Sequence, residues 1–170
     1  PFVPTLGAIK AMSDIDDLVR NSLTDFTNGV FTSAWRGKER EAVSLFAFGY
    51  LIKHCRPGSV LYDPAQIGIE VRVPKADSLG KKAEVCKDLV IWSKPGSTCW
   101  GENEWPLAIL EWKANQPQVF AGDVAWLSAF SAKRPAFTGY TVCLDLKQRN
   151  FRLSCTRIQQ QHVQHEWLVV

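Results

Sequence analysis

The stretch Leu107-Ala-Ile-Leu-Glu-Trp-Lys113 places an acid and a base two residues apart at the end of an apolar run. Buried Glu and Lys are rare unless they are paired or bind something, so the pattern is unusual for simple packing. Side chains alternate between the two faces of a β-strand. Glu111 and Lys113 would therefore point the same way, with Cα atoms about 6.5 Å apart, and Trp112 would point to the other face. The stretch predicts a strand that ends in a small charged site.

Two further strands are predicted upstream. Residues 67–73 alternate apolar and polar side chains, as a half-buried strand does, and residues 84–92 form a second strand after a polar, Lys-rich loop at 75–82. The connections are too short for crossover helices, so we expect the three strands to form an antiparallel meander. In that arrangement Asp88 meets Glu111 at neighbouring strand ends.

Helices and two more strands are predicted around this meander. The expected helices span about 13–27, 38–54 and 119–133, and the expected strands, 140–146 and 151–158, form a hairpin. The second helix is apolar almost all round, so we expect it to be buried. Residues 159–165 are expected to be a polar tail. The predicted order of elements is α, α, β, β, β, α, β, β.

Length and composition favour one folded domain. The chain has 170 residues, 46% hydrophobic and 22% charged, which is close to the globular average. We expect a single α/β domain over 1–170, with a helical extension at 1–36, a core at 37–146 and a C-terminal strand and tail at 147–170. The formal charge of +3 does not decide whether a polyanion binds. The sequence contains no G-x-S-x-G, P-loop or G-x-G-x-x-G motif, which argues against the corresponding hydrolases, NTPases and dinucleotide enzymes.

The cysteines and the apolar runs bear on the compartment. The five cysteines are an odd number without a C-x-x-C pair, which is typical of reduced, buried thiols in an intracellular protein. No run approaches the roughly 18 apolar residues of a membrane span, and residues 1–10 lack the layout of a signal peptide. We therefore expect a cytoplasmic protein without a membrane partner.

Asp88 and Glu111 together suggest metal chemistry. Two carboxylates at close range repel each other unless one is protonated or a cation neutralises them. Oxygen ligands of this kind select Mg²⁺ or Mn²⁺. A metal-activated water is a strong nucleophile, and Lys113 would orient it or stabilise the charge that grows on a phosphate.

These residues also resemble a known family. Asp88, then Glu111-Trp112-Lys113 at the end of an apolar strand, with a Glu-bearing helix upstream and a helix and strand downstream, is similar to the PD-(D/E)xK nuclease superfamily, which has the restriction-endonuclease-like fold. Lys87 stands where the motif name has Pro. The resemblance implies an αβββαβ core, a mixed central sheet flanked by helices, which the order from Lys38 to Leu146 reproduces.

The resemblance also implies roles for single residues. Asp88 and Glu111 would hold Mg²⁺ or Mn²⁺, Lys113 would be the catalytic lysine, and Glu39 would be the accessory acid from the second predicted helix. Glu39 is favoured over Glu41 because it lies on the stripe of Val43 and Phe46, but both remain open.

The implied activity is metal-dependent hydrolysis of DNA. Candidate contacts to the phosphate backbone are the basic residues around the first two strands, Arg72, Lys82, Lys87 and Lys94, which would otherwise be a solvated rim. An alternative is a catalytically inactive module of the same fold that binds nucleic acid or a protein. RNA is an alternative substrate, and a second copy of the chain an alternative partner. His162 and His165 fit a polar tail better than a zinc site, because no further ligand lies at metal-site spacing.

Overall fold

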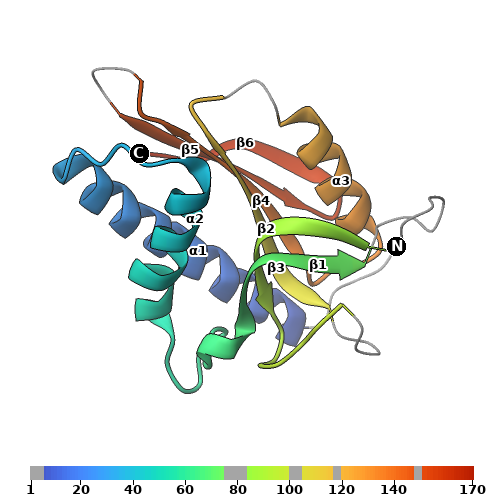
Figure 1. The fold of residues 1–170 in the computed structure, drawn as a ribbon. Coiled ribbons are helices and arrows are strands. Elements are labelled where there is room, and N and C mark those ends of the chain that lie inside the picture. Colours follow the sequence, from blue (N-terminus) through green and yellow to red (C-terminus); the bar gives the residue numbers. More distant parts are fainter. Residues whose placement is uncertain (1–5, 75–83, 100–104, 117–119, 148–150) are drawn as a thin grey trace.

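A six-stranded mixed sheet runs through the centre of the molecule (Figure 1). The computed structural model describes residues 6–74, 84–99, 105–116, 120–147 and 151–170. The strands lie in sequence order and are β1 (Ile67–Pro74), β2 (Glu84–Trp92), β3 (Pro106–Ala114), β4 (Thr138–Asp145), β5 (Arg152–Gln159) and β6 (His162–Val169). The predicted Lys-rich loop at 75–82 lies outside the described residues.

Strand direction follows the length of the connections. β1, β2 and β3 pair antiparallel, so the predicted meander is confirmed. β3 and β4 pair parallel, which requires a crossover, and α3 (Ala121–Ala132) lies in that connection. β4, β5 and β6 are again antiparallel. The prediction of a mixed α/β fold with a mixed central sheet is confirmed.

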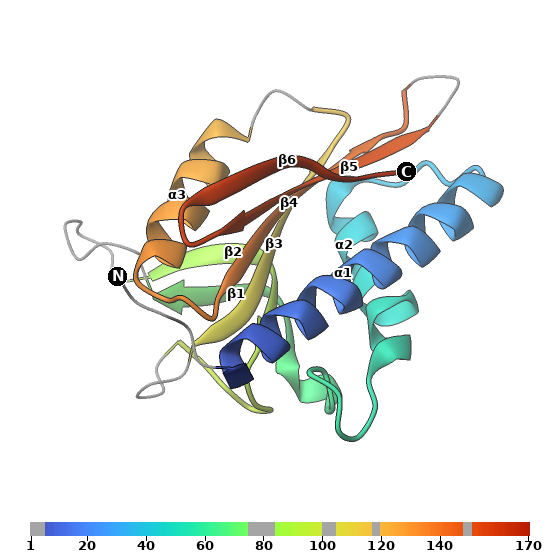
Figure 2. The ribbon, with the colours of Figure 1, turned by 180° about the vertical axis from the view of Figure 1, so that it is seen from behind.

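Helices cover both faces of the sheet (Figures 1 and 2). α1 (Leu6–Thr32) and α2 (Glu39–Gly49) pack on one face and α3 on the other. The alternation of β3 explains this division. Trp112 points into the α1–α2 core, where its ring centroid lies 5.5 Å from Phe26 and 5.2 Å from Phe46. Ile109, which shares its strand face with Glu111 and Lys113, packs in the α3 core.

Two helix predictions need correction. α1 is longer than the expected span of 13–27. The second predicted helix, 38–54, is α-helical only to Gly49 and continues as a 3₁₀ turn, Leu51–His54, because Tyr50 leaves the helical region at φ −132°. Its burial follows one stripe, since Phe48 is 67% exposed. The periodicity located both helices but not their ends.

The C-terminal segment is a second correction. Residues 159–165, expected to be a polar tail, turn into β6, which pairs with β5 from Gln159 opposite His162. Gln160 and Gln161 both have positive φ, as a tight hairpin turn requires, without the Gly or Asn that usually marks one. β6 is polar because it is an edge strand with many exposed side chains.

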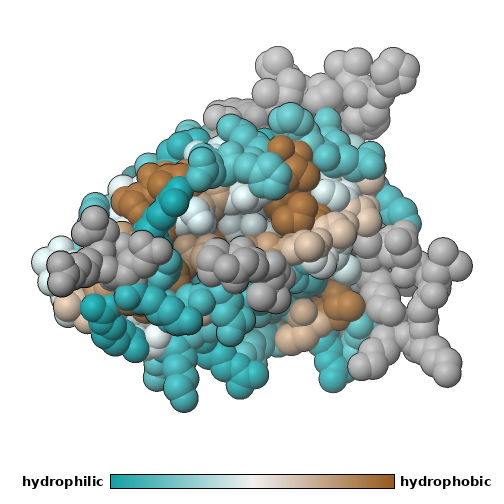
Figure 3. All heavy atoms as spheres, turned by 90° about the horizontal axis from the view of Figure 1, so that it is seen from above, coloured by the Kyte–Doolittle hydropathy of each residue, from teal (hydrophilic) through white to brown (hydrophobic). Residues whose placement is uncertain are grey.

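Much of the face of the molecule seen from above is hydrophilic (Figure 3). On the face shown in Figure 3, hydrophobic residues form separate patches between hydrophilic ones. α1 has 27 residues, yet neither it nor another helix of the described ranges has the apolar length that crossing a membrane demands.

Candidate active site

The side-chain alternation of β1 reverses at Glu70. Ile69 packs against the α1–α2 core, whereas Val71, which an unbroken strand would place on the same face, packs in the α3 core. Between them Glu70 has φ 50°, a left-handed conformation that is uncommon for residues other than Gly. The reversal places the Glu70 side chain outside both cores, where it is exposed.

β2 reverses at the same level. Leu89 packs against the α1–α2 core and Val85 in the α3 core, although the two are four residues apart. Lys87 points to the same face as Val85, since its Nζ lies 3.9 Å from the ring centroid of Trp126 on α3. Asp88 lies at the level of Glu70, between the pairs Ile69–Leu89 and Val71–Lys87, and lines a groove beside α2. The side chain of Lys87 therefore lies against α3, and that of its neighbour Asp88 lies at the groove beside α2.

Asp88 and Glu111 come together where the β2–β3 pairing ends. The last regular pair on this side is Leu89 with Leu110. Beyond it, the backbone N–H of Trp112 donates to Asp88 Oδ2 at 2.8 Å, and the N–H of Asp88 lies 3.5 Å from Glu111 Oε2. At this end of the pairing, side-chain carboxylates lie next to backbone N–H groups that carbonyl oxygens of the partner strand would otherwise accept from. Asp88 and Glu111 are therefore close to each other.

Glu111 is the acid at this point whose pKa is shifted by its surroundings. It is 4% exposed and forms an ion pair with Lys87, which is 6% exposed. Burial raises the pKa of Glu111 to about 7; the charge of Lys87 opposes the rise, and the charges of Asp88 and Asp123 add to it. A buried carboxyl of this kind is typical of functional sites.

Lys113 lies at the end of the sheet, where both helical layers reach it. Its Nζ donates to the carbonyl of Trp112 at 2.7 Å. It lies 3.8 Å from Glu39 Oε1 on α2 and 3.9 Å from Asp123 Oδ2 on α3. Two acids from opposite faces of the sheet therefore hold this ammonium group.

The two candidate accessory acids differ in position. Glu39 reaches the site, where its Oε2 accepts a hydrogen bond from the N–H of Ala114 at 3.2 Å. Glu41 is exposed, and its Oε2 accepts from the N–H of Lys38 at 2.6 Å, a contact that caps α2. The geometry brings Glu39 and not Glu41 to Lys113.

The proposed basic rim is dispersed. Lys87 is buried against Glu111, so it does not belong to an exposed rim. Arg72 pairs with Glu84 across the β1–β2 edge. Lys94 is exposed in the turn after β2, and Lys82 lies outside the described residues. His162 and His165 stand three residues apart on β6, so they point to opposite faces of a strand.

Asp123 and the role of Lys87 were missed at the level of sequence. Asp123 is the acid in the first turn of α3 and the one charged residue of that helix, and this was the available signal. No signal in the sequence indicated the orientation of Lys87, because that orientation depends on the reversal of side-chain alternation in β2.

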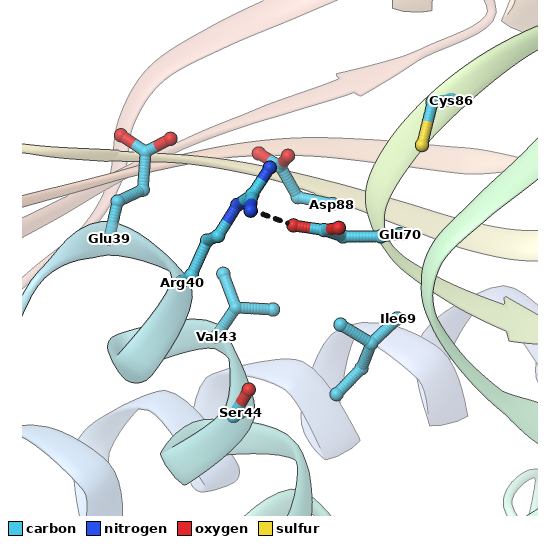
Figure 4. A pocket seen from close by; sticks show the side chains of 8 residues that line it. All are labelled: Glu39, Arg40, Val43, Ser44, Ile69, Glu70, Cys86 and Asp88. Carbon is cyan, nitrogen blue, oxygen red and sulfur yellow. Dashed lines mark ion pairs between the residues drawn. The ribbon is translucent and has the colours of Figure 1, made fainter.

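A groove opens beside these acids, with a volume of about 520 Å³. Glu39 and Asp88 line one part of it (Figure 4). Arg40 reaches from α2 toward β1, where its Nε lies 2.7 Å from Glu70 Oε1. Val43 and Ile69 supply apolar lining.

The donors fit a hard divalent cation in chemistry, although they are not preassembled. Four carboxylates, Glu39, Asp88, Glu111 and Asp123, surround two ammonium groups, Lys87 and Lys113. Carboxylate oxygens suit Mg²⁺ or Mn²⁺. Within the described ranges, however, no three His, Cys, Asp or Glu side chains converge on one ion position. Lys87 already neutralises Glu111, so a cation at Asp88 and Glu111 would have to replace it.

Comparisons with protein-family models, with curated protein sequences and with solved structures gave no match.

Proposed function

We propose that this protein is a metal-dependent nuclease of the PD-(D/E)xK type that hydrolyses phosphodiester bonds of DNA. The observation that carries the proposal is the meeting of Asp88 and Glu111 where the β2–β3 pairing ends, with Lys113 two residues beyond Glu111 on β3. The succession α2, β1, β2, β3, α3, β4 supports it, because it is the order expected for a restriction-endonuclease-like core.

Each site residue has a role in this proposal. Asp88 and Glu111 would hold Mg²⁺ or Mn²⁺, which would lower the pKa of a water beside the phosphate so that this water could lose its proton and attack phosphorus. Lys113 stabilises the negative charge that develops on the phosphate oxygens. Glu39 and Asp123, at 3.8 and 3.9 Å, hold the Lys113 ammonium in place.

Lys87 competes with the metal in this scheme. Its ammonium and a divalent cation neutralise the same carboxylate, so only one can do so at a time. Replacement of Lys87 by Met should therefore strengthen Mn²⁺ binding, which titration calorimetry measures without reference to activity. Weaker Mn²⁺ binding by Lys87→Met would contradict this arrangement.

Cleavage assays test the activity. Purified protein is mixed with plasmid, single-stranded and branched DNA, and with RNA, in Mg²⁺ or Mn²⁺. We expect DNA cleavage that is lost in Glu111→Ala and Lys113→Ala and kept in Lys147→Ala, a control at an exposed lysine. Cleavage that survives both site variants would refute the assignment, and cleavage of RNA alone would change the substrate.

The second candidate is an inactive module of this fold that binds nucleic acid or a protein. The observation in its favour is the Lys87–Glu111 ion pair, which satisfies the buried acid without a metal. This candidate predicts no Mn²⁺ binding by calorimetry, either in the native protein or in Lys87→Met. Heat of Mn²⁺ binding that disappears in Asp88→Ala would count against it.

A further inference from the structure

The groove beside α2 continues from the acids of the site. Glu39 and Asp88 line it, and they also contact the site, Glu39 at Lys113 and Asp88 beside Glu111. A strand whose cleaved phosphate lies beside this site would therefore extend into the groove. Its volume, about 520 Å³, lies within the range of ordinary ligand sites.

Arg40 supplies the positive charge in this groove. Among the described residues that line it, Arg40 is the one cation beside three acids. Its side chain is 85% exposed, and its partner Glu70 is 47% exposed. Exposed ion pairs of this kind contribute little and exchange readily, so Arg40 can leave Glu70 for a stronger anion. A guanidinium binds phosphate well because its planar donors match the phosphate oxygens.

The remaining lining suits the rest of a nucleotide. Val43 and Ile69 lie on the same side of the Arg40–Glu70 pair in Figure 4 and provide apolar contact for a sugar or base. Cys86 lines the groove from β2 and is exposed. The groove thus offers one phosphate-binding group and an apolar wall next to the acids.

We propose that this groove binds one nucleotide of the substrate strand next to the cleaved bond, and that Arg40 binds its phosphate in place of Glu70. The proposal rests on the proposed nuclease function. Glu70 then acts as a competitor that keeps Arg40 in position until the strand arrives. Its left-handed φ of 50°, at the level of Asp88, is what presents the carboxylate to Arg40.

Binding measurements with a matched control test the proposal. The probe is a fluorescein-labelled 12-nucleotide single-stranded DNA, titrated with protein in EDTA so that no cleavage occurs. The molecule contains a second surface pair, Arg152 with Glu166 at 2.8 Å, in which Glu166 also has a positive φ, of 49°. Arg152→Ala and Glu166→Gln at the β5–β6 edge therefore control for the general effect of charge.

We expect Arg40→Ala to weaken binding about tenfold, and to lower the slope of log Kd against log salt concentration by about one. Glu70→Gln should tighten binding about threefold, and only while Arg40 is present. The double variant Arg40→Ala, Glu70→Gln should match Arg40→Ala. Equal effects of Glu70→Gln in both backgrounds, or equal losses in Arg40→Ala and Arg152→Ala, would overturn the proposal, as would failure of the native protein to bind the probe.

Alkylation of Cys86 locates the bound strand. We expect the oligonucleotide to protect Cys86 from N-ethylmaleimide in the native protein and not in Arg40→Ala, while Cys55 reacts equally in both, as read by peptide mass spectrometry. Unchanged Cys86 labelling would place the strand elsewhere and refute the groove. Cleavage in Mn²⁺ is measured in parallel: absent cleavage with Arg40-dependent binding refutes the nuclease alone, and cleavage without any effect of Arg40 or Glu70 on binding refutes this inference alone.

Discussion

Two clusters of charged side chains lie against the sheet, and they differ in how completely their charges are matched. The first joins α1 to the sheet. Arg157 Nε on β5 donates to both carboxylate oxygens of Asp16, at 2.7 and 2.9 Å, and the Tyr140 hydroxyl donates to Asp16 Oδ1 at 2.6 Å. One acid therefore has one cation and one further donor. We call this the anchoring cluster.

The second cluster, at the ends of β2 and β3, is unmatched. Four acids share two lysines, and burial with neighbouring acids raises the pKa of Glu111 to about 7. We call these six residues, Glu39, Lys87, Asp88, Glu111, Lys113 and Asp123, the site cluster. A matched cluster stabilises one geometry, whereas an excess of buried acid costs stability and favours a cation. The difference is the reason to expect function at the second cluster and not at the first.

The largest expected effect separates activity from stability in the site cluster. Lys113→Ala should lower the rate of DNA cleavage about 100- to 1000-fold, because the charge that forms on the phosphate loses its partner. The free energy of unfolding should change by under about 1 kcal/mol, since the lysine is only partly buried. A cleavage time course and urea unfolding measure the two. A cleavage rate within threefold of the native value would show that the site cluster, like the anchoring cluster, has no role in cleavage.

The anchoring cluster should show the reverse. Asp16→Ala removes the acceptor of the Arg157 Nε–H and of the buried Tyr140 hydroxyl, although Arg157 still donates to Gln159 Oε1, and should lower the free energy of unfolding by about 3 kcal/mol. Below its melting temperature the variant should still cleave DNA. The control is Asp17→Ala, at an exposed position on the same helix. Equal losses in the two variants would mean that the anchoring cluster contributes nothing specific.

The pH dependence of stability should expose the unmatched acid. Because the pKa of Glu111 rises from 4.5 to about 7 on folding, the folded state holds the proton more tightly, and this group makes stability fall as pH rises through that interval. Lys87→Met removes the charge that opposes the rise. In EDTA we expect the variant to lose about 2 kcal/mol at pH 8 and little near pH 5. A loss that is the same at both pH values would show that Glu111 does not cause it.

The smallest effect concerns one hydrogen bond of the anchoring cluster. Tyr140→Phe removes one donor to Asp16 but keeps the aromatic ring, and Arg157 still donates to Asp16. We therefore expect the free energy of unfolding to fall by about 1 kcal/mol. Tyr62→Phe, at a side chain 43% exposed, is the control and should leave stability unchanged. Thermal unfolding at one pH compares the two. A loss of 3 kcal/mol, as large as that expected for Asp16→Ala, would show that Tyr140 and not Arg157 holds the acid.

Sequence patterns located the elements that build the site and missed some of its contacts. The apolar run before Glu111 predicted β3, and its alternation predicted that Trp112 packs on the other face, as it does against Phe26 and Phe46. β6 was missed because its turn, at Gln160 and Gln161, carries no Gly or Asn. Lys87 was placed on a basic rim because the reversal at Glu70 and Asp88 leaves no trace in hydrophobic periodicity.

The sequence by itself determined that an acid and a base end a buried strand and that a second acid lies on the neighbouring strand, because periodicity depends only on residues close together in the chain. Only the tertiary structure decided which charge meets which. Lys87 and Glu111 are 24 residues apart, and Glu39 and Ala114 are 75 apart. Such pairs depend on strand register, on a positive φ at one residue and on two helices that close over opposite faces of the sheet, so no local pattern encodes them.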